Sequence, residues 1–147
     1  MDKIIALAQS LVKRYHTRDP FTLCAELEVH VVFTELPETV EGFYHYIDGH
    51  KFIYLNNRLS ENTARVICAH ELAHALMHAD YNVLELLRDT FFYCPRFERE
   101  ADIFCAALLI DKEAAQSALP ELLSMEQLAA LSGVPVELVD MRFAEGF

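Results

Sequence analysis

The sequence predicts an α+β fold in which a small antiparallel sheet of about three strands is packed between helices. Apolar residues recur at helical spacing in residues 1–28. β-branched and aromatic residues then concentrate in residues 30–56, and helical patterns return from residue 60 onward. No repeat, low-complexity tract or long linker divides the chain, so we expect a single domain over residues 1–147.

The composition is typical of a folded protein that avoids nucleic acid and membranes. Hydrophobic residues make up 53% of the chain and charged residues 24%, and the net charge is −11. Binding to nucleic-acid phosphates requires a basic surface, so we expect no direct nucleic-acid partner. The longest apolar run, residues 103–110, is too short to cross a bilayer. The sequence gives no oligomeric state.

The N-terminus and the cysteines indicate a cytoplasmic protein. Residues 1–3 lead into an amphipathic pattern and not into the apolar run of an export signal. The chain has four cysteines without a CxxC spacing, which we expect to be reduced and mostly buried. These cysteines are Cys24, Cys68, Cys94 and Cys105.

Two short helices are predicted within residues 1–28 from capping residues and periodicity. Asp2 is placed to cap a helix whose apolar residues recur as far as Tyr15. Asp19 followed by Pro20 is typical of an N-cap and a first helical position. This pair predicts a second helix that ends at about Glu28.

The sheet is predicted within residues 30–56. "HVVFTEL" (residues 30–36) is one candidate strand, and "GFYHYIDGHKFIYLN" (residues 42–56) contains two more. Asp48 and Gly49 separate the last two runs, and Asp-Gly favours a type I′ hairpin turn with positive φ at both residues. We therefore expect a hairpin and one further antiparallel strand.

Helices are predicted for the rest of the chain. Ser60 is a suitable N-cap for a helix over residues 60–79, and Pro95 opens another over residues 95–110. A further helix or irregular stretch is expected from Val83. The C-terminal helices occupy residues 111–147, where a Gly-Val-Pro turn separates the last two.

The last two helices superficially resemble a DNA-reading helix-turn-helix. Arg142 is the only basic residue in "EQLAALSGVPVELVDMRF", so the segment offers little grip on phosphate. A C-terminal packing unit is the better interpretation, and a docking surface for a protein partner is a second one.

The segment "CAHELAHALMH" (residues 68–78) carries the chemistry. Its helix is apolar nearly all round, and such a helix is buried. A buried carboxylate at Glu71 needs a partner, while His70 and His74 lie one turn apart on one face. A divalent cation bound by both imidazoles resolves the difficulty, and the spacing is the HExxH zinc motif with Glu71 as catalytic base. The alternative, two core histidines satisfied by carbonyl groups, leaves Glu71 unexplained.

A catalytic zinc site normally takes a third protein ligand, and "PRFEREADIFCAALLI" (residues 95–110) supplies one. On a helical wheel Glu98 lies about 60° from the centre of the apolar stripe, while Glu100 and Asp102 lie about 100° away on opposite sides. We therefore expect Glu98 to bind the metal. Asp102 shares the side of Glu98 and is placed to accept the second N–H of a ligand histidine. Glu100 is expected to be a solvated surface charge.

These residues carry a resemblance to a known family. The pair HExxH and ExxxD, here His70 to His74 and Glu98 to Asp102, is similar to the gluzincin arrangement of zinc peptidases. More narrowly, "CAHELAHALMH" and "EREADIFCAALLI" resemble the ImmA/IrrE metallopeptidases, whose helices read approximately HELgHxxxH and ExxANxFAxxLLMP. The sequence departs from that pattern by Asp102 in place of a common Asn and by Ile110-Asp111 in place of Met-Pro.

The resemblance implies a function. ImmA/IrrE proteins occur in phages, mobile elements and bacterial genomes, and characterised ones cleave, or license the removal of, a helix-turn-helix repressor. It implies that His70, His74 and Glu98 bind Zn²⁺, that Glu71 is the catalytic base, and that the partner is a repressor protein. The same ligand types also accept manganese, iron or cobalt.

The donor that stabilises the oxyanion stays open among several residues. His78 lies one turn beyond His74, although a fourth protein ligand there would close the solvent position of the metal. Tyr93 lies shortly before Glu98, and the hairpin offers three more candidates. These are Tyr44, His45 and Tyr46.

Two other functional readings compete with the peptidase. One is a non-catalytic, zinc-containing regulatory module that acts by stoichiometric contact with its partner. The other is a DNA-associated regulator that uses the C-terminal helices, which the acidic charge disfavours.

Overall fold

A computed structural model describes residues 1–80, 94–118 and 123–144 of the chain. It confirms the α+β class and the order of helices, sheet and helices. The predicted stretch from Val83 lies outside the described residues. The described elements are α1 (Asp2–Tyr15), α2 (Pro20–Glu26), β1 (Val29–Thr34), β2 (Gly42–Ile47), β3 (His50–Asn56), α3 (Glu61–Met77), α5 (Pro95–Leu109), α6 (Lys112–Ala118), α7 (Met125–Ser132) and α8 (Val136–Phe143).

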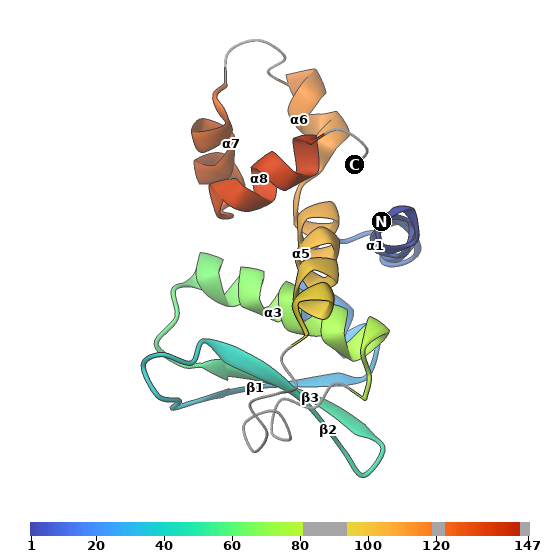
Figure 1. The fold of residues 1–147 in the computed structure, drawn as a ribbon, viewed down its shortest axis with the longest axis vertical. Helices are drawn as coiled ribbons and strands as arrows, with labels where there is room; N and C mark the ends of the chain where they lie inside the picture. Colours follow the sequence, from blue (N-terminus) through green and yellow to red (C-terminus); the bar gives the residue numbers. More distant parts are fainter. Residues whose placement is uncertain (81–93, 119–122, 145–147) are drawn as a thin grey trace.

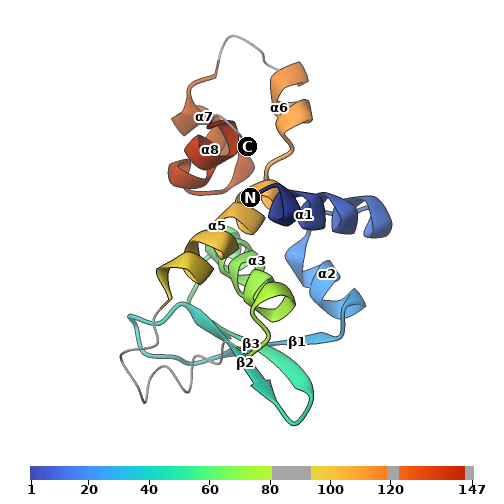
Figure 2. The ribbon, with the colours of Figure 1, turned by 45° about the vertical axis from the view of Figure 1, so that its right-hand side comes forward.

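The elements are stacked in layers around α3 (Figure 1). The sheet forms one end of the molecule, α3 lies across it, and α5 crosses α3 on the side away from the sheet. Helices α6, α7 and α8 gather beyond the far end of α5, while α1 packs beside α5 and α2 beside α3 (Figure 2). Within the described residues no helix is both long and apolar enough to cross a bilayer.

The sheet is mixed, which corrects the prediction of an antiparallel sheet. Its strand order is β1-β3-β2, and β3 pairs antiparallel with β2 but parallel with β1. Loop 35–41 carries the chain from β1 at one edge to β2 at the other. Since β1 and β2 run in opposite directions, a hairpin strand β3 that lies between them must be parallel to β1. Alternation of residue types does not report which strands are neighbours, so the sequence did not reveal this order.

The hairpin turn is confirmed. Asp48 has φ of 50° and Gly49 has φ of 78°, both in the left-handed region that a type I′ turn requires. The turn sets the register in which Ile47 pairs with His50 and Tyr44 with Ile53. Register fixes which side chains face α3, because successive residues of a strand point to opposite faces.

The core lies between the sheet, α3 and α5. Tyr44, Ile53 and Leu55 are fully buried on the inner face of the sheet, and Leu72 of α3 and Phe104 of α5 are fully buried as well. Burial of a large apolar side chain contributes about 1.5–3 kcal/mol to stability. Because α3 is buried on two sides, it is apolar nearly all round. Its buried polar side chains must find hydrogen-bond partners within the protein.

The predicted helix starts are mostly confirmed. The Asp19 side chain accepts a hydrogen bond from the Thr22 N–H at 3.1 Å, and the Ser60 hydroxyl accepts one from the Thr63 N–H at 3.2 Å. Asp2 is the first residue of α1 and not its cap, which is Met1. Cys24, Cys68 and Cys105 are buried thiols outside any disulfide, as expected.

Two arginines anchor the C-terminal end of α5. Arg18 donates from Nη1 to the carbonyl oxygens of Ala107 and Leu108 at 3.2 and 2.9 Å. The buried Arg142 of α8 donates from Nε to the carbonyl oxygen of Ile110 at 3.2 Å. These carbonyl groups have no acceptor role within the helix, so the arginines satisfy them and fix α5 against α8 and the α1–α2 segment.

The last two helices pack against α5 through α8, as the packing-unit interpretation expects. Ser124 and Gln127 form a capping box at the start of α7, and Gly133 ends that helix with φ of 66°. Leu138 and Val139 of α8 are buried. Arg65 of α3 also donates to the carbonyl oxygen of Ser132, which ties α7 to α3.

Replacement of Gly42 by Ala is expected to destabilise the protein. An added Cβ would lie 2.7 Å from the carbonyl oxygen of Tyr54 and 2.9 Å from Cγ2 of Ile67, so β2 would have to move away from β3 and α3. Such overpacking costs roughly 1–3 kcal/mol. We expect chemical denaturation to show this loss for Gly42→Ala and no comparable loss for the exposed Gln9→Ala. Equal stabilities of the two variants would contradict the close approach.

Candidate metal centre

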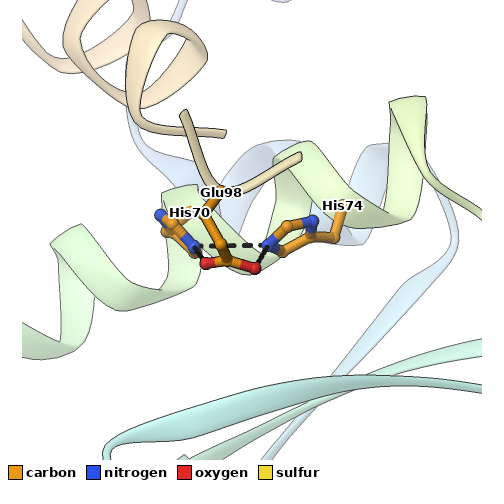
Figure 3. Close-up of side chains that lie close together, drawn as sticks. All are labelled: His70, His74 and Glu98. Carbon is orange, nitrogen blue, oxygen red and sulfur yellow. Dashed lines mark hydrogen bonds and ion pairs between the residues drawn. The ribbon is translucent and has the colours of Figure 1, made fainter. Parts of the chain in front are cut away.

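Two imidazoles of α3 and one carboxylate of α5 converge on a single point (Figure 3). His70 and His74 lie one turn apart and face α5, whose first turn carries Glu98. The His74 side chain is 2% exposed, the His70 side chain 19% and the Glu98 side chain 28%. Helices α3 and α5 therefore shield the convergence point, but it is still accessible to solvent.

The spacing of the three groups fits zinc. Nε2 of His70 lies 3.1 Å from Oε2 of Glu98, and Nε2 of His74 lies 3.4 Å from Oε1 of the same carboxylate. The two Nε2 atoms are 3.3 Å apart. Zinc binds such atoms at about 2.0–2.1 Å, which places the ligands of a tetrahedral site about 3.3–3.4 Å from one another. The three residues present therefore match the donor set and the spacing of a zinc site.

The local charges favour a cation at this point. Burial lowers the pKa of the His70 ring, but hydrogen bonds to Asp102 and Glu98 outweigh it and raise that pKa to about 10. Burial raises the pKa of Glu98, yet its contacts with the His70 and His74 rings hold that pKa well below its ordinary value. The carboxylates thus make a field in which positive charge between the two rings is stabilised.

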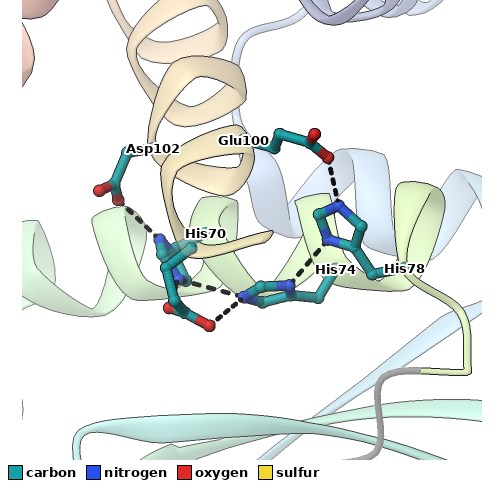
Figure 4. Close-up of polar contacts among 6 residues, drawn as sticks. His70, His74, His78, Glu100 and Asp102 are labelled. Carbon is teal, nitrogen blue, oxygen red and sulfur yellow. Dashed lines mark hydrogen bonds and ion pairs between the residues drawn. The ribbon is translucent and has the colours of Figure 1, made fainter. Parts of the chain in front are cut away.

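Asp102 contacts the outer nitrogen of His70. Its Oδ1 lies 3.0 Å from His70 Nδ1 (Figure 4), whereas the other ring nitrogen, Nε2, contacts Glu98. A carboxylate only accepts, so Nδ1 donates to Asp102. Nε2, which faces the convergence point, offers its lone pair to a cation once its own proton has left.

His78 does not lie at the convergence point but behind His74. Its Nδ1 lies 3.0 Å from Nδ1 of His74, and its Nε2 lies 2.8 Å from Oε2 of Glu100. The expectation that Glu100 is a solvated surface charge is therefore wrong, since its side chain is only 22% exposed and paired with His78. Among the described residues the group able to hold a metal consists of His70, His74 and Glu98.

A comparison with known families decides the affiliation. Residues 24–144 match the peptidase M78 family, described as the IrrE N-terminal-like domain. The chain belongs to this IrrE-like peptidase family. The match spans the sheet, both helices of the convergence point and the C-terminal helices, and agrees with the resemblance of the two motifs.

Two relatives extend the comparison. The chain is 30% identical over 139 residues to the "Uncharacterized immunity region protein 2" of Bacillus phage phi105, an alignment that covers 95% of this chain and 88% of the phage protein. It also shares its fold with a structure titled "Mycobacterium tuberculosis transcriptional regulator", with a TM-score of 0.65 and 18% identity. That alignment covers 97% of this chain but 46% of the regulator, so the chain spans about half of that protein.

Glu71 of this IrrE-like peptidase chain is buried beside the convergence point. The residue is 8% exposed, and its Oε2 atom has no hydrogen-bond partner among the described residues. Burial raises the pKa of Glu71 to about 7, and the charge of Glu98 adds to the rise. The charge of His70 and the backbone N–H of Tyr44 act in the opposite direction. Near neutral pH this carboxyl is thus able both to take and to give a proton.

A groove of about 990 Å³ leads to these residues. It is lined by the β1–β2 loop with the start of β2, by one flank of α3, by α5 and by α8, and the lining includes His70, Glu71 and Asp102. Residue spacing along the sequence did not reveal this groove, because its lining comes from segments far apart in the chain.

The other proposed oxyanion donors have different locations. His45 lies on the outer face of the sheet next to Tyr54, whereas the convergence point lies on the other side of the sheet. Tyr44 points inward, but its hydroxyl donates to the carbonyl oxygen of Ala79 at 3.1 Å, and burial raises its pKa to about 12. Tyr46 is 39% exposed. Tyr93 lies outside the described residues.

Zinc is expected to stabilise the fold through His74. A ligand that binds only the folded state at 1,000 times its dissociation constant adds about 4 kcal/mol to the free energy of unfolding. We therefore expect a chelator to lower the melting temperature of the wild-type protein measured by calorimetry. His74→Leu should show no zinc-dependent rise, while Glu113→Gln, on the exposed surface of α6, should behave like wild type. An equal zinc response in His74→Leu would contradict the site.

Proposed function

We propose that the chain is a zinc-dependent endopeptidase that cleaves a helix-turn-helix transcriptional repressor of a phage, mobile element or stress regulon. The observation that carries the proposal is the convergence of His70, His74 and Glu98 beside the buried carboxyl of Glu71, whose Oε2 atom has no hydrogen-bond partner among the described residues. Membership of a peptidase family supports the reaction class. The printed name of the phage relative, an immunity region protein, supports a regulatory substrate.

The proposed roles follow from the donor types. His70, His74 and Glu98 would hold zinc, which when bound supplies a Lewis acid that polarises a carbonyl group and lowers the pKa of water. Glu71 accepts a proton from the attacking water as the water oxygen bonds to the peptide carbon. The same proton passes from Glu71 to the amide nitrogen as the C–N bond breaks, which gives an amine and a carboxylic acid. The acid then releases the second proton of the water, to the amine or to solvent, and becomes a carboxylate.

The groove is the proposed binding cleft for the substrate chain. Strand β2 lies at the edge of the sheet, and its first residues, Gly42 and Phe43, line the groove. In an antiparallel pair, alternate residues turn their backbone N–H and C=O groups away from the partner strand. An extended peptide that lies along β2 would therefore have backbone groups with which to pair, in the same groove that Glu71 lines.

Replacement of Glu71 by Gln tests the catalytic proposal. Gln keeps the shape of the side chain but cannot take a proton, so cleavage is expected to fall by about 10²–10⁴-fold. Zinc content and melting temperature should stay close to wild type. The measurement is cleavage of a purified repressor encoded beside the gene, with Glu113→Gln as the matched control.

The same variant separates the peptidase from the non-catalytic regulatory module. A module that acts by stoichiometric contact keeps its function when Glu71 is replaced by Gln. Full derepression in cells by a Glu71→Gln protein that no longer cleaves anything would therefore contradict the peptidase and favour the module.

The charge of the groove predicts a substrate preference. Glu38, Glu41 and Glu137 line it, and no lysine or arginine is among its lining residues. A DNA-binding repressor is rich in basic residues, so opposite charges would attract it. We expect peptides with Lys beside the cleaved bond to have a higher kcat/KM than matched peptides with Glu, and the difference should shrink with salt.

A charge-reversal variant provides the control for that preference. Glu38→Lys combined with Glu137→Lys should reduce the preference for basic peptides, whereas Glu113→Lys, outside the groove, should leave it unchanged. Cleavage with no charge preference would contradict the assignment of the groove but not the peptidase itself.

A further inference from the structure

We propose that His78 and Glu100 are positioning residues that hold His74 in the single neutral tautomer able to bind a cation. The inference rests on the proposed zinc site. It concerns two side chains outside the metal-binding group, since His78 contacts Nδ1 of His74, the nitrogen that does not face Glu98, and Glu100 contacts the far nitrogen of His78 (Figure 4).

The three residues form a continuous chain of polar contacts. Nδ1 of His74 lies 3.0 Å from Nδ1 of His78, and Nε2 of His78 lies 2.8 Å from Oε2 of Glu100. The His74 and His78 side chains are 2% and 3% exposed. Hydrogen bonds to buried rings are not readily exchanged for water, so their direction is set by the protein partners.

The carboxylate at the end of the chain fixes the direction of every bond. The other oxygen of Glu100 accepts from Nε of Arg96 at 2.7 Å, so this group is paired with a cation as a carboxylate and is an acceptor. Nε2 of His78 must then donate, which leaves its Nδ1 as an acceptor in the neutral ring. His74 therefore donates from Nδ1, and its Nε2 lone pair faces Glu98 and His70.

Independent contacts hold the His78 ring in place. His78 caps the end of α3, and its backbone N–H donates to the carbonyl oxygen of His74 at 2.8 Å. Its ring stacks on Phe97 with the centroids 4.1 Å apart and an angle of 17° between the planes. The acceptor that faces His74 is thus rigid, as a positioning group has to be.

The two proposed ligand histidines are supported from opposite sides of α5. Asp102 accepts directly from Nδ1 of His70, whereas Glu100 acts on His74 through the ring of His78 (Figure 4). Without the Glu100 carboxylate, the described contacts no longer hold the proton of His78 on Nε2, and the ring can carry it on Nδ1. His74 would then accept at Nδ1 and carry its own proton on Nε2, where it blocks a cation.

Zinc affinity, measured by competition with a chromophoric chelator, tests the chain. Loss of a group that supports a metal ligand weakens metal binding by about 10–100-fold. We expect that loss in Glu100→Ala and in His78→Leu, which keeps an apolar side chain but removes the acceptor. His78→Asn should bind zinc more tightly than His78→Leu, because its side-chain oxygen restores an acceptor near the position of Nδ1.

Arg96→Ala is the matched control. Arg96 contacts the other oxygen of Glu100 at 2.7 Å but has an 81% exposed side chain, so its removal should change zinc affinity by less than about five-fold. The melting curves of the zinc-free proteins report any general damage to the fold. A purely structural role for His78 would lower the melting temperature of both His78 variants and leave their zinc affinities equal.

The ring nitrogens give a direct readout of the tautomer. In ¹⁵N-labelled, zinc-loaded wild-type protein, the His74 proton should reside on Nδ1. If Glu100→Ala, His78→Leu and His78→Asn all bind zinc like wild type, the positioning role is overturned while the zinc site stands. If the wild-type protein itself binds no zinc, the proposed function and this inference both fall.

Discussion

Three electron-pair donors held within 3.4 Å of one another are the constraint on which the rest of this structure depends. Two imidazole lone pairs and a carboxylate repel one another unless a proton or a metal cation lies between them. The chain nevertheless directs His70, His74 and Glu98 to one point and supports the outer nitrogens of both rings. A proton shared between His70 and Glu98 satisfies only part of this donor set, whereas a metal cation accepts electron pairs from all three groups at once.

The remainder of the fold holds α3 and α5 in their crossed arrangement at that point. The sheet packs against one side of α3, and the fully buried Leu72 and Phe104 join the two helices to the same core. Arg18 and Arg142 secure the far end of α5. The segments that hold α5 therefore include α8, which also lines the groove, so one helix serves both the scaffold and the proposed cleft.

The sequence revealed the parts of the site that depend on one helix at a time. His70 and His74 share a face because of helical periodicity alone, and the apolar stripe of residues 95–110 indicated the orientation of Glu98 and Asp102. The contact of Glu100 could not be predicted from a helical wheel, because a wheel describes one helix at a time. Glu100 lies against His78 only because α5 crosses α3. The hairpin was predicted from its turn, whereas the position of β1 beside β3 depends on a contact distant in sequence.

Family membership and the geometry of the site give different kinds of information about the chemistry of the protein. A family match and a shared fold do not specify a reaction, whereas a buried carboxyl beside a possible metal site in an acid-lined groove supports the proposed hydrolysis in chemical terms. In that interpretation the acidic character of the chain is a means of attracting a basic protein and not only of keeping the surface solvated.

X-ray diffraction from crystals of the zinc-loaded protein, recorded at the zinc absorption edge, tests the central claim most directly. The account predicts one anomalous peak within bonding distance of Nε2 of His70, Nε2 of His74 and the carboxylate of Glu98. Asp102 and His78 should still contact the Nδ1 atoms of the two rings, and one coordination position should be left for solvent. A peak elsewhere, a metal bound without Glu98, or a fourth protein ligand in the solvent position would contradict it.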